Sequence, residues 1–198
     1  MWLLEGERKN ITLFLSRWNM TTVYLVRHAE TDLNREEIIQ SKKNTHLNTN
    51  GVNKVKVLRE TILDLGCDIC YTSPLFRTLE TAFGLVADKC LIVNDDRLVD
   101  RDMGEFEGKA TSEFDHQKYW DYKLDSGDCG VEKLSSVFER CQKFLDEVLE
   151  KNKGKKILIV SHNGPIRAMH HILHKTNLET EPLRFSVPNC YFEKIDIE

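Results

Sequence analysis

Short apolar runs alternate along this chain with longer segments in which apolar residues recur every three or four positions. The short runs predict strands at residues 22–26, 67–72, 90–93 and 157–160, and a last strand at 190–196. The run at 157–160 has no polar alternation, which is typical of a parallel strand covered on both faces. We therefore expect a buried, mostly parallel sheet at the centre of the fold.

The longer segments have the period of amphipathic helices. Asn48 or Thr49 is the expected N-cap of one helix, and Gly66 is expected to end it. Long helical patterns also run over residues 134–154 and 162–174. Because strands alternate with helices, we expect an α/β three-layer sandwich with a mostly parallel central sheet flanked by helices and joined by right-handed crossovers.

Two regions are harder to assign from the pattern. Ser73 is the expected cap of the helix after the second strand, since Pro74 suits a first helical position. Residues 94–130 are rich in Asp, Gly and aromatics and predict an irregular region that could cover a substrate. Its aromatic residues either form an apolar wall of a site or a local core, and the sequence favours neither: Phe106, Phe114, Tyr119, Trp120 and Tyr122.

Composition places the chain among ordinary soluble domains. It has 198 residues, 40% apolar and 30% charged, with a net charge of −4. That length fits one domain. The sequence has no block of basic residues, so nucleic acid is not an expected partner. No apolar run reaches the roughly 18 residues needed to span a membrane. Residues 1–19 make a poor signal peptide, so we expect an N-terminal extension at 1–19, a domain at 20–198 and a cytoplasmic location.

Six cysteines give no disulfide framework, and reduced thiols are expected. Cys67 and Cys70 have the spacing of a metal or redox pair. No second pair accompanies them, and they run into a predicted strand, so a metal or redox role is disfavoured. Cys70 and Cys141 fall in apolar-periodic segments, where a thiol acts as a small apolar side chain.

Three of the apolar runs are followed by side chains suited to phosphate. Arg27 and His28 follow the first strand, Arg77 lies beyond the second, and His162 follows the fourth. The carboxyl ends of parallel strands meet at one edge of a sheet, so these groups should converge there. Each piece alone could be a surface pair or a helix cap. Together, two imidazoles and two guanidinium forks predict a site for a dianionic phosphoryl group.

The run 27–31, Arg-His-Ala-Glu-Thr, resembles the motif of the histidine phosphatase (phosphoglycerate mutase-like) superfamily. Arg-His-Gly-Glu-Thr is the commoner form, so Ala29 is a small-for-small exchange. The likeness extends over about residues 22–170. It implies the fold of that superfamily and a phosphohistidine intermediate formed on neutral His28, whose pKa the two arginines should depress.

The resemblance also implies roles for the neighbouring residues. Arg27, Arg77 and His162 would neutralise the phosphoryl oxygens, with Asn34, Gln40 and Asn163 as further phosphate or substrate contacts.

The general acid is expected in residues 97–108. This segment is similar to the family's Leu-x-Glu followed by Gly-x-x-Glu-Gly, and the register puts Asp100 where the family usually has glutamate. Aspartate is one methylene shorter, so the backbone must bring its carboxyl closer. Glu105 and Asp102 are the alternative acids, and a solvated acidic loop is the alternative without function.

We therefore expect a metal-independent phosphomonoesterase without a cofactor, acting on a small phosphorylated metabolite. Two alternatives remain. One is phosphoglycerate mutase-type phosphoryl transfer, although the short chain favours hydrolysis. The other is a non-catalytic phosphate-binding module. His170 and His174 share a helix face, but no Glu or Asp nearby in the sequence completes a metal site. We expect no nucleic-acid or membrane partner and allow for a homodimer.

Overall fold

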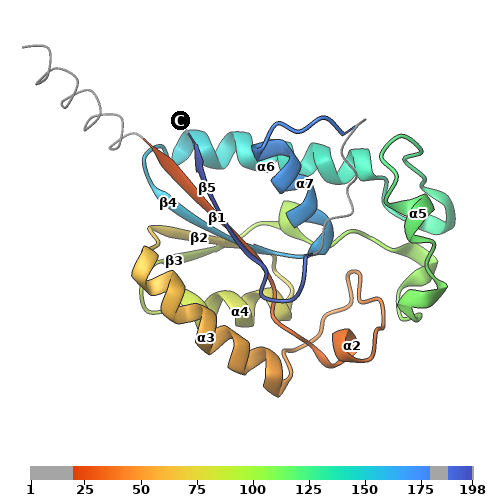
Figure 1. The fold of residues 1–198 in the computed structure, drawn as a ribbon, viewed down its shortest axis with the longest axis horizontal. Coiled ribbons are helices and arrows are strands. Elements are labelled where there is room, and N and C mark those ends of the chain that lie inside the picture. The colour runs from red at the N-terminus through yellow and green to blue at the C-terminus, as the bar shows by residue number, and fades with distance from the viewer. Residues whose placement is uncertain (1–19, 179–186, 198) are drawn as a thin grey trace, which may run out of the picture.

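A five-stranded sheet forms the centre of the computed structural model, which describes residues 20–178 and 187–197 (Figure 1). The proposed extension at 1–19 lies outside the described residues. The strand order is β3-β2-β4-β1-β5. The strands are β1 (Thr21–Arg27), β2 (Ile69–Thr72), β3 (Leu91–Asn94), β4 (Lys156–Ser161) and β5 (Phe192–Ile197).

The first four strands are parallel, and β5 runs antiparallel to β1 at the edge. In the register of the sheet, Arg27 of β1 pairs with Ser161 of β4, and Thr72 of β2 pairs with Val160. The carboxyl ends of the three central strands are therefore side by side. The predicted α/β fold with a mostly parallel sheet is confirmed.

Helices cover both faces of the sheet (Figure 1). One layer consists of α3 (Thr49–Leu65) and α4 (Phe76–Val86) and the other of α6 (Leu134–Lys151) and α7 (Asn163–Leu173). Alternate residues of the central strands supply the two cores. Val23 and Leu25 pack with α6 and α7, whereas Tyr24 and Val26 pack with α3 and α4. All four are at most 1% exposed, so β1 is buried on both sides.

The expected cap of α3 is present, but that of α4 is not. The Asn48 side chain accepts a hydrogen bond from the backbone N–H of Gly51, at 2.8 Å, and Gly66 ends the helix. The prediction that Ser73 caps α4 was wrong, because the helix begins at Phe76 with Leu75 as its N-cap. The hydroxyl of Ser73 is instead near a histidine of the site described below.

The irregular region after β3 forms short helices around an aromatic cluster. Its one α-helical turn is α5 (His116–Tyr119), accompanied by 3-10 turns. Phe106, Phe114 and Tyr119 pack against one another with ring centroids 4.8–5.4 Å apart. This region, with α2 (Asp32–Arg35), lies at the end of the sheet where the parallel strands terminate (Figure 1).

Candidate active site

His28 lies at the end of β1, and its surroundings fix its protonation. The side chain is 2% exposed. Its Nδ1 atom is 2.7 Å from the carbonyl oxygen of Ala29, which can only accept, so Nδ1 carries the proton. The Nε atom of Arg77 donates to Nε2 of His28 at 3.3 Å. Nε2 therefore holds a lone pair, as a nucleophilic nitrogen must.

Arg77 is fully buried and held at several atoms. Its Nη1 and Nη2 atoms donate to the carbonyl oxygens of Lys43 and Ser41, both at 2.8 Å. The loop before α3 thus fixes the position of the Arg77 guanidinium, although Arg77 itself belongs to α4. A rigid fork loses little rotamer entropy when it binds an anion.

His162 precedes α7, beside His28. The two ring centroids are 5.2 Å apart, and Nε2 of His162 is 2.9 Å from the hydroxyl oxygen of Ser73. Its Nδ1 atom is buried without a hydrogen-bond partner among the described residues, and so is the Nε atom of Arg27. Buried polar atoms are normally paired. Two such atoms at one strand edge are suited to an anion that accepts from both.

Arg27 points its guanidinium toward the chain that precedes β5. Its Nη1 atom donates to the carbonyl oxygen of Val187 at 2.5 Å. From the same segment, Asn189 donates to the carbonyl oxygen of His28 and to the side-chain oxygen of Asn34, each at 3.1 Å. The segment after α7 therefore holds the backbone that carries the nucleophile.

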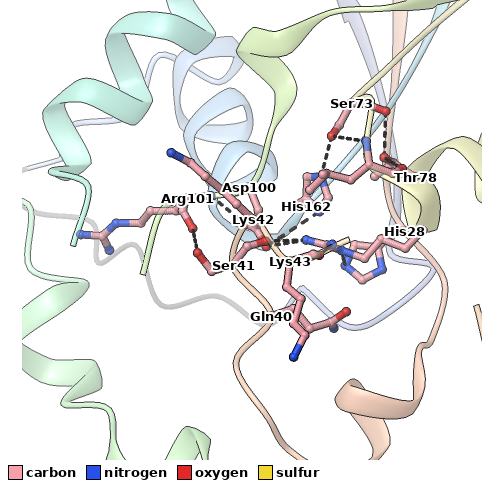
Figure 2. Close-up of polar contacts among 12 residues, drawn as sticks. His28, Gln40, Ser41, Lys42, Lys43, Ser73, Thr78, Asp100, Arg101 and His162 are labelled. Carbon is pink, nitrogen blue, oxygen red and sulfur yellow. Dashed lines mark hydrogen bonds and ion pairs between the residues drawn. The ribbon is translucent and has the colours of Figure 1, made fainter. Parts of the chain in front are cut away.

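Asp100 lies beside His162, on the chain that follows β3 (Figure 2). Its Oδ2 atom is 3.3 Å from Nη2 of Arg77 and 3.8 Å from Nδ1 of His162. Its Oδ1 atom accepts the backbone N–H of Arg101 at 2.9 Å, which fixes the carboxyl group. The two other candidate acids are elsewhere: Asp102 is paired with Lys42, and neither it nor Glu105 lines the cavity described below.

Burial and charge shift the protonation of these groups in opposite directions. Burial, followed by the charges of Arg77 and Arg27, lowers the pKa of His28 and of His162 well below the usual 6.5. Burial raises the pKa of Asp100 against the opposing pull of the two arginines. Burial also lowers the pKa of Arg27 to about 10, which leaves it charged at neutral pH. The site thus combines neutral imidazoles with charged guanidiniums.

A cavity of about 130 Å³ opens in front of His28. Gln40, Asn34 and Asn163, which we predicted as phosphate or substrate contacts, all line it. Gln40 accepts a hydrogen bond from Thr45, and Asn163 accepts one from Arg167. Among the described residues that line the cavity, Asp100 is the only carboxylate.

The aromatic residues after β3 divide between the two alternatives. Phe114 and Trp120 form part of the cavity wall, together with His116. Tyr119 and Phe106 do not line it and belong to the local core behind that wall. Both interpretations of this region are therefore correct for different residues.

Sequence reasoning missed several residues that support the site. Ser73 was interpreted as a helix cap, yet it contacts His162. Ser41, Val187 and Asn189 carry no motif, because they act through backbone carbonyls or reach His28 from far along the chain. The Pro-Asn pair at 188–189 is the one sequence feature that could have pointed to Asn189, and it is a weak indication of a role in the site.

Comparison with known proteins identifies the family of the chain. The sequence model of the histidine phosphatase superfamily (branch 1) matches residues 23–198. The chain is 29% identical over 186 residues to phosphoserine phosphatase 1 of Hydrogenobacter thermophilus, covering 90% of this chain and 88% of that protein. It is 34% identical over 153 residues to the uncharacterized phosphatase PhoE of Bacillus subtilis, covering 76% of each. Among solved structures, YhfR of Bacillus stearothermophilus matches with a TM-score of 0.78 at 26% identity, covering 90% of this chain and 92% of that one.

The fold, the family model and the phosphatases among the relatives define an α/β phosphatase. The chain belongs to the histidine phosphatase superfamily, as its first motif indicated. Relatives named as probable phosphoglycerate mutases also match. The phosphatases among the relatives favour hydrolysis over the mutase alternative.

Among the described helices, none combines the length and the apolar character needed to cross a membrane.

Proposed function

We propose that this protein is a metal-independent phosphomonoesterase in which His28 is the nucleophile. The observation that carries the proposal is the arrangement around Nε2 of His28, which is unprotonated and 3.3 Å from the guanidinium of Arg77. Arg27 and His162 add buried N–H groups that other described residues leave unpaired. Positive charge that a metal would otherwise supply therefore comes from arginine.

The first step transfers the phosphoryl group to the enzyme. The lone pair on Nε2 of His28 attacks phosphorus in line, and the bond to the ester oxygen breaks. The hydrogen bond from Nδ1 to the Ala29 carbonyl supports the positive charge that develops on the ring. Arg27 and Arg77 stabilise the negative charge on the phosphoryl oxygens, which is the largest contribution expected in such a reaction.

Asp100 is proposed as the general acid. Burial raises the pKa of Asp100 against the pull of Arg77, and a phosphate dianion bound beside the carboxyl would raise that pKa further, which supports a protonated carboxyl in the substrate complex. It gives that proton to the departing alcohol oxygen. The resulting carboxylate then takes a proton from water, whose oxygen attacks the phosphohistidine. Inorganic phosphate leaves, and His28 and protonated Asp100 are restored.

The proposed substrate is a small phosphate monoester. A cavity of about 130 Å³ favours a compact metabolite over a protein side chain. Phosphoserine is the first ester to assay, because it is named for a relative that shares 29% identity with this chain. Phe114 and Trp120 would contact the part of the ester beyond the phosphate.

A labelling experiment tests the proposal. Incubation with a ³²P-labelled phosphate ester and rapid quenching should leave an acid-labile label on wild-type protein. The His28→Ala variant should show neither label nor turnover. His46→Ala is the matched control, since His46 is an exposed histidine outside the cavity lining. A His28→Ala variant that turns over at the wild-type rate would disprove the assignment.

Two further assays separate the alternatives. Release of phosphate from p-nitrophenyl phosphate, with no isomerisation of 3-phosphoglycerate in the presence of its bisphosphate primer, is expected for a hydrolase. A chelator should leave this turnover unchanged, and its loss would contradict the metal-independent mechanism. A binding module without activity would yield neither phosphate nor the labelled intermediate.

A further inference from the structure

We propose that His170, His174 and Glu193 form a binding site for Zn²⁺ that is separate from the phosphate cavity. His170 is on the last turn of α7, His174 is the residue that caps the C-terminal end of this helix, and the glutamate is on β5. One ligand atom from each of the three residues lies within 4.8 Å of the other two. None of the three lines the cavity in front of His28.

His174 follows His170 by four residues, and its helical backbone angles at the C-cap place its imidazole on the same side as that of His170. Their ring centroids are 4.4 Å apart. Nδ1 of His170 is 2.9 Å and 3.0 Å from the two carboxylate oxygens of Glu193. Nε2 of His174 is 2.8 Å from the Oε1 atom of the same carboxylate. Both imidazoles therefore point at one acidic group.

Glu193 occupies a position that the pattern of β5 would give to an apolar residue. Side chains of a strand alternate between faces. Ile195 and Ile197 pack against the cluster that contains α6 and α7, whereas Phe192 packs on the opposite face. Glu193 therefore faces the helix layer, where its side chain is 16% exposed. The hydroxyl of Tyr191 donates to it at 3.0 Å and holds it in place.

This donor set is suited to zinc. Two imidazole nitrogens and one carboxylate oxygen, with water at the fourth position, are a common zinc coordination. Tetrahedral ligands at 2.0–2.1 Å from the ion are about 3.3 Å apart. The separations of 2.8–3.0 Å between the histidine nitrogens and the carboxylate oxygens need to open by only a few tenths of an ångström, and the ligand nitrogens of the two histidines are within 4.8 Å of each other. Imidazole ligands disfavour Mg²⁺ and Ca²⁺, which prefer oxygen.

A bound ion would join the end of α7 to the edge strand of the sheet. The chain between these elements carries Val187 and Asn189, which contact Arg27 and the backbone of His28. The ion would therefore stabilise the elements on both sides of a segment that supports the site. We assign the ion no part in the reaction, since none of its ligands lines the phosphate cavity or contacts His28 in the structure.

Zinc titration of the metal-free full-length protein against a chromophoric chelator tests the proposal. Wild-type protein should bind one zinc ion per chain at this site. His174→Ala and Glu193→Gln should each weaken that binding at least about tenfold, the loss that even an outer partner of a metal ligand typically causes. His174 is partly exposed, so its replacement should not prevent folding.

Two controls make the result specific. His46→Ala removes an exposed histidine that is paired with Glu80 in the same manner, and it should bind zinc as the wild type does. His28→Ala should also retain this site. Added zinc should raise the melting temperature of the wild type and of both controls, but not of His174→Ala. Phosphatase turnover should be equal in wild type and His174→Ala, so failure here is distinguishable from failure of the proposed reaction.

Either of two results would overturn the site. One is equal zinc affinity in the wild type, His174→Ala and Glu193→Gln. The other is a wild-type protein that binds no stoichiometric zinc.

Discussion

Asp100 illustrates how a departure from the family pattern is accommodated at a single residue. Its side chain is one methylene shorter than the usual glutamate. Even so, its Oδ2 atom reaches Nη2 of Arg77 at 3.3 Å. The hydrogen bond from the Arg101 backbone to Oδ1 and the burial of the Arg101 side chain hold this part of the chain close to the site. The position of the backbone therefore compensates for the shorter side chain.

The protonation of His28 and Asp100 predicts the pH dependence of turnover. His28 must be neutral, and its pKa is well below 6.5, so the acidic limb of kcat/KM should lie well below pH 6.5. Asp100 must be protonated, and its pKa is raised above 3.8, so activity should fall as the pH rises through that raised value. Bound phosphate dianion raises it further, so the alkaline limb of kcat should lie at higher pH than that of kcat/KM.

Asp100→Asn provides the check on that assignment. Its kcat for an alkyl phosphate should fall by roughly 10²–10⁴-fold, and its alkaline limb should disappear. The loss should be smaller with p-nitrophenyl phosphate, because that leaving group departs without a proton. An unchanged alkaline limb in the variant would assign the acid to another group. Glu105→Gln, at a carboxylate outside the cavity lining, is the matched control.

At the scale of elements, the sequence predicted those strands and helix ends that depend only on the local pattern of residues. Apolar runs located all five strands, and Asn48 and Gly66 located the ends of α3. The start of α4 was not predictable in this way, because Ser73 has a tertiary partner in His162 that overrides its capping tendency. Glu193 was missed for a similar reason, since only the sheet brings it beside His170.

Family resemblance supplied the rest of the candidate site. That Arg77 and His28 lie at the same edge of the sheet follows from the parallel direction of their strands, which the alternation of elements predicts, whereas the strand order was not predicted. The carbonyl groups of Ser41 and Lys43 that hold Arg77 carry no sequence signal, because every residue has such a carbonyl. Contacts made by backbone groups are therefore the hardest part of the site to predict from a single sequence.

Gly51, at the start of α3, is predicted to be required for the position of the nucleophile loop. A Cβ atom there would be 2.2 Å from the carbonyl oxygen and 2.9 Å from the nitrogen of Glu30, two residues after His28. Gly51→Ala should therefore lower the free energy of unfolding by about 1–3 kcal/mol, as overpacking does. This sign is opposite to the usual gain when alanine replaces glycine in a helix. Urea denaturation measures the change.

The same helix offers the control for this prediction. Asn53→Ala alters an exposed position of α3 and should change stability by no more than about 0.5 kcal/mol. Because the Glu30 backbone must move in Gly51→Ala, kcat/KM should also fall in that variant and not in the control. Equal stability of Gly51→Ala and wild type would show that the loop yields without cost.

At the scale of the whole molecule, charge is distributed unevenly. The chain has a net charge of −4, yet buried arginines are gathered at one end of the sheet. Burial lowers the pKa of both Arg27 and Arg77, which means that burial acts against their charged forms in the folded protein. A bound dianion would offset that cost. The burial of these charged arginines therefore lowers the stability of the free enzyme, a cost that is common at active sites.

This distribution predicts that inorganic phosphate stabilises the folded protein. Phosphate that binds only the native state should raise the free energy of unfolding by about 2.7 kcal/mol at a concentration of one hundred times its Kd. Arg77→Met should abolish this increment whatever its effect on the free protein, because it removes the buried guanidinium that we propose binds the anion. Lys56→Met removes one positive charge from an exposed position on α3 and should keep the full increment. Thermal unfolding with and without phosphate, at an ionic strength matched with sodium chloride, measures the difference. If Arg77→Met kept the full increment, the anion would have to bind elsewhere on the molecule, and the buried cations at the strand ends would need another explanation.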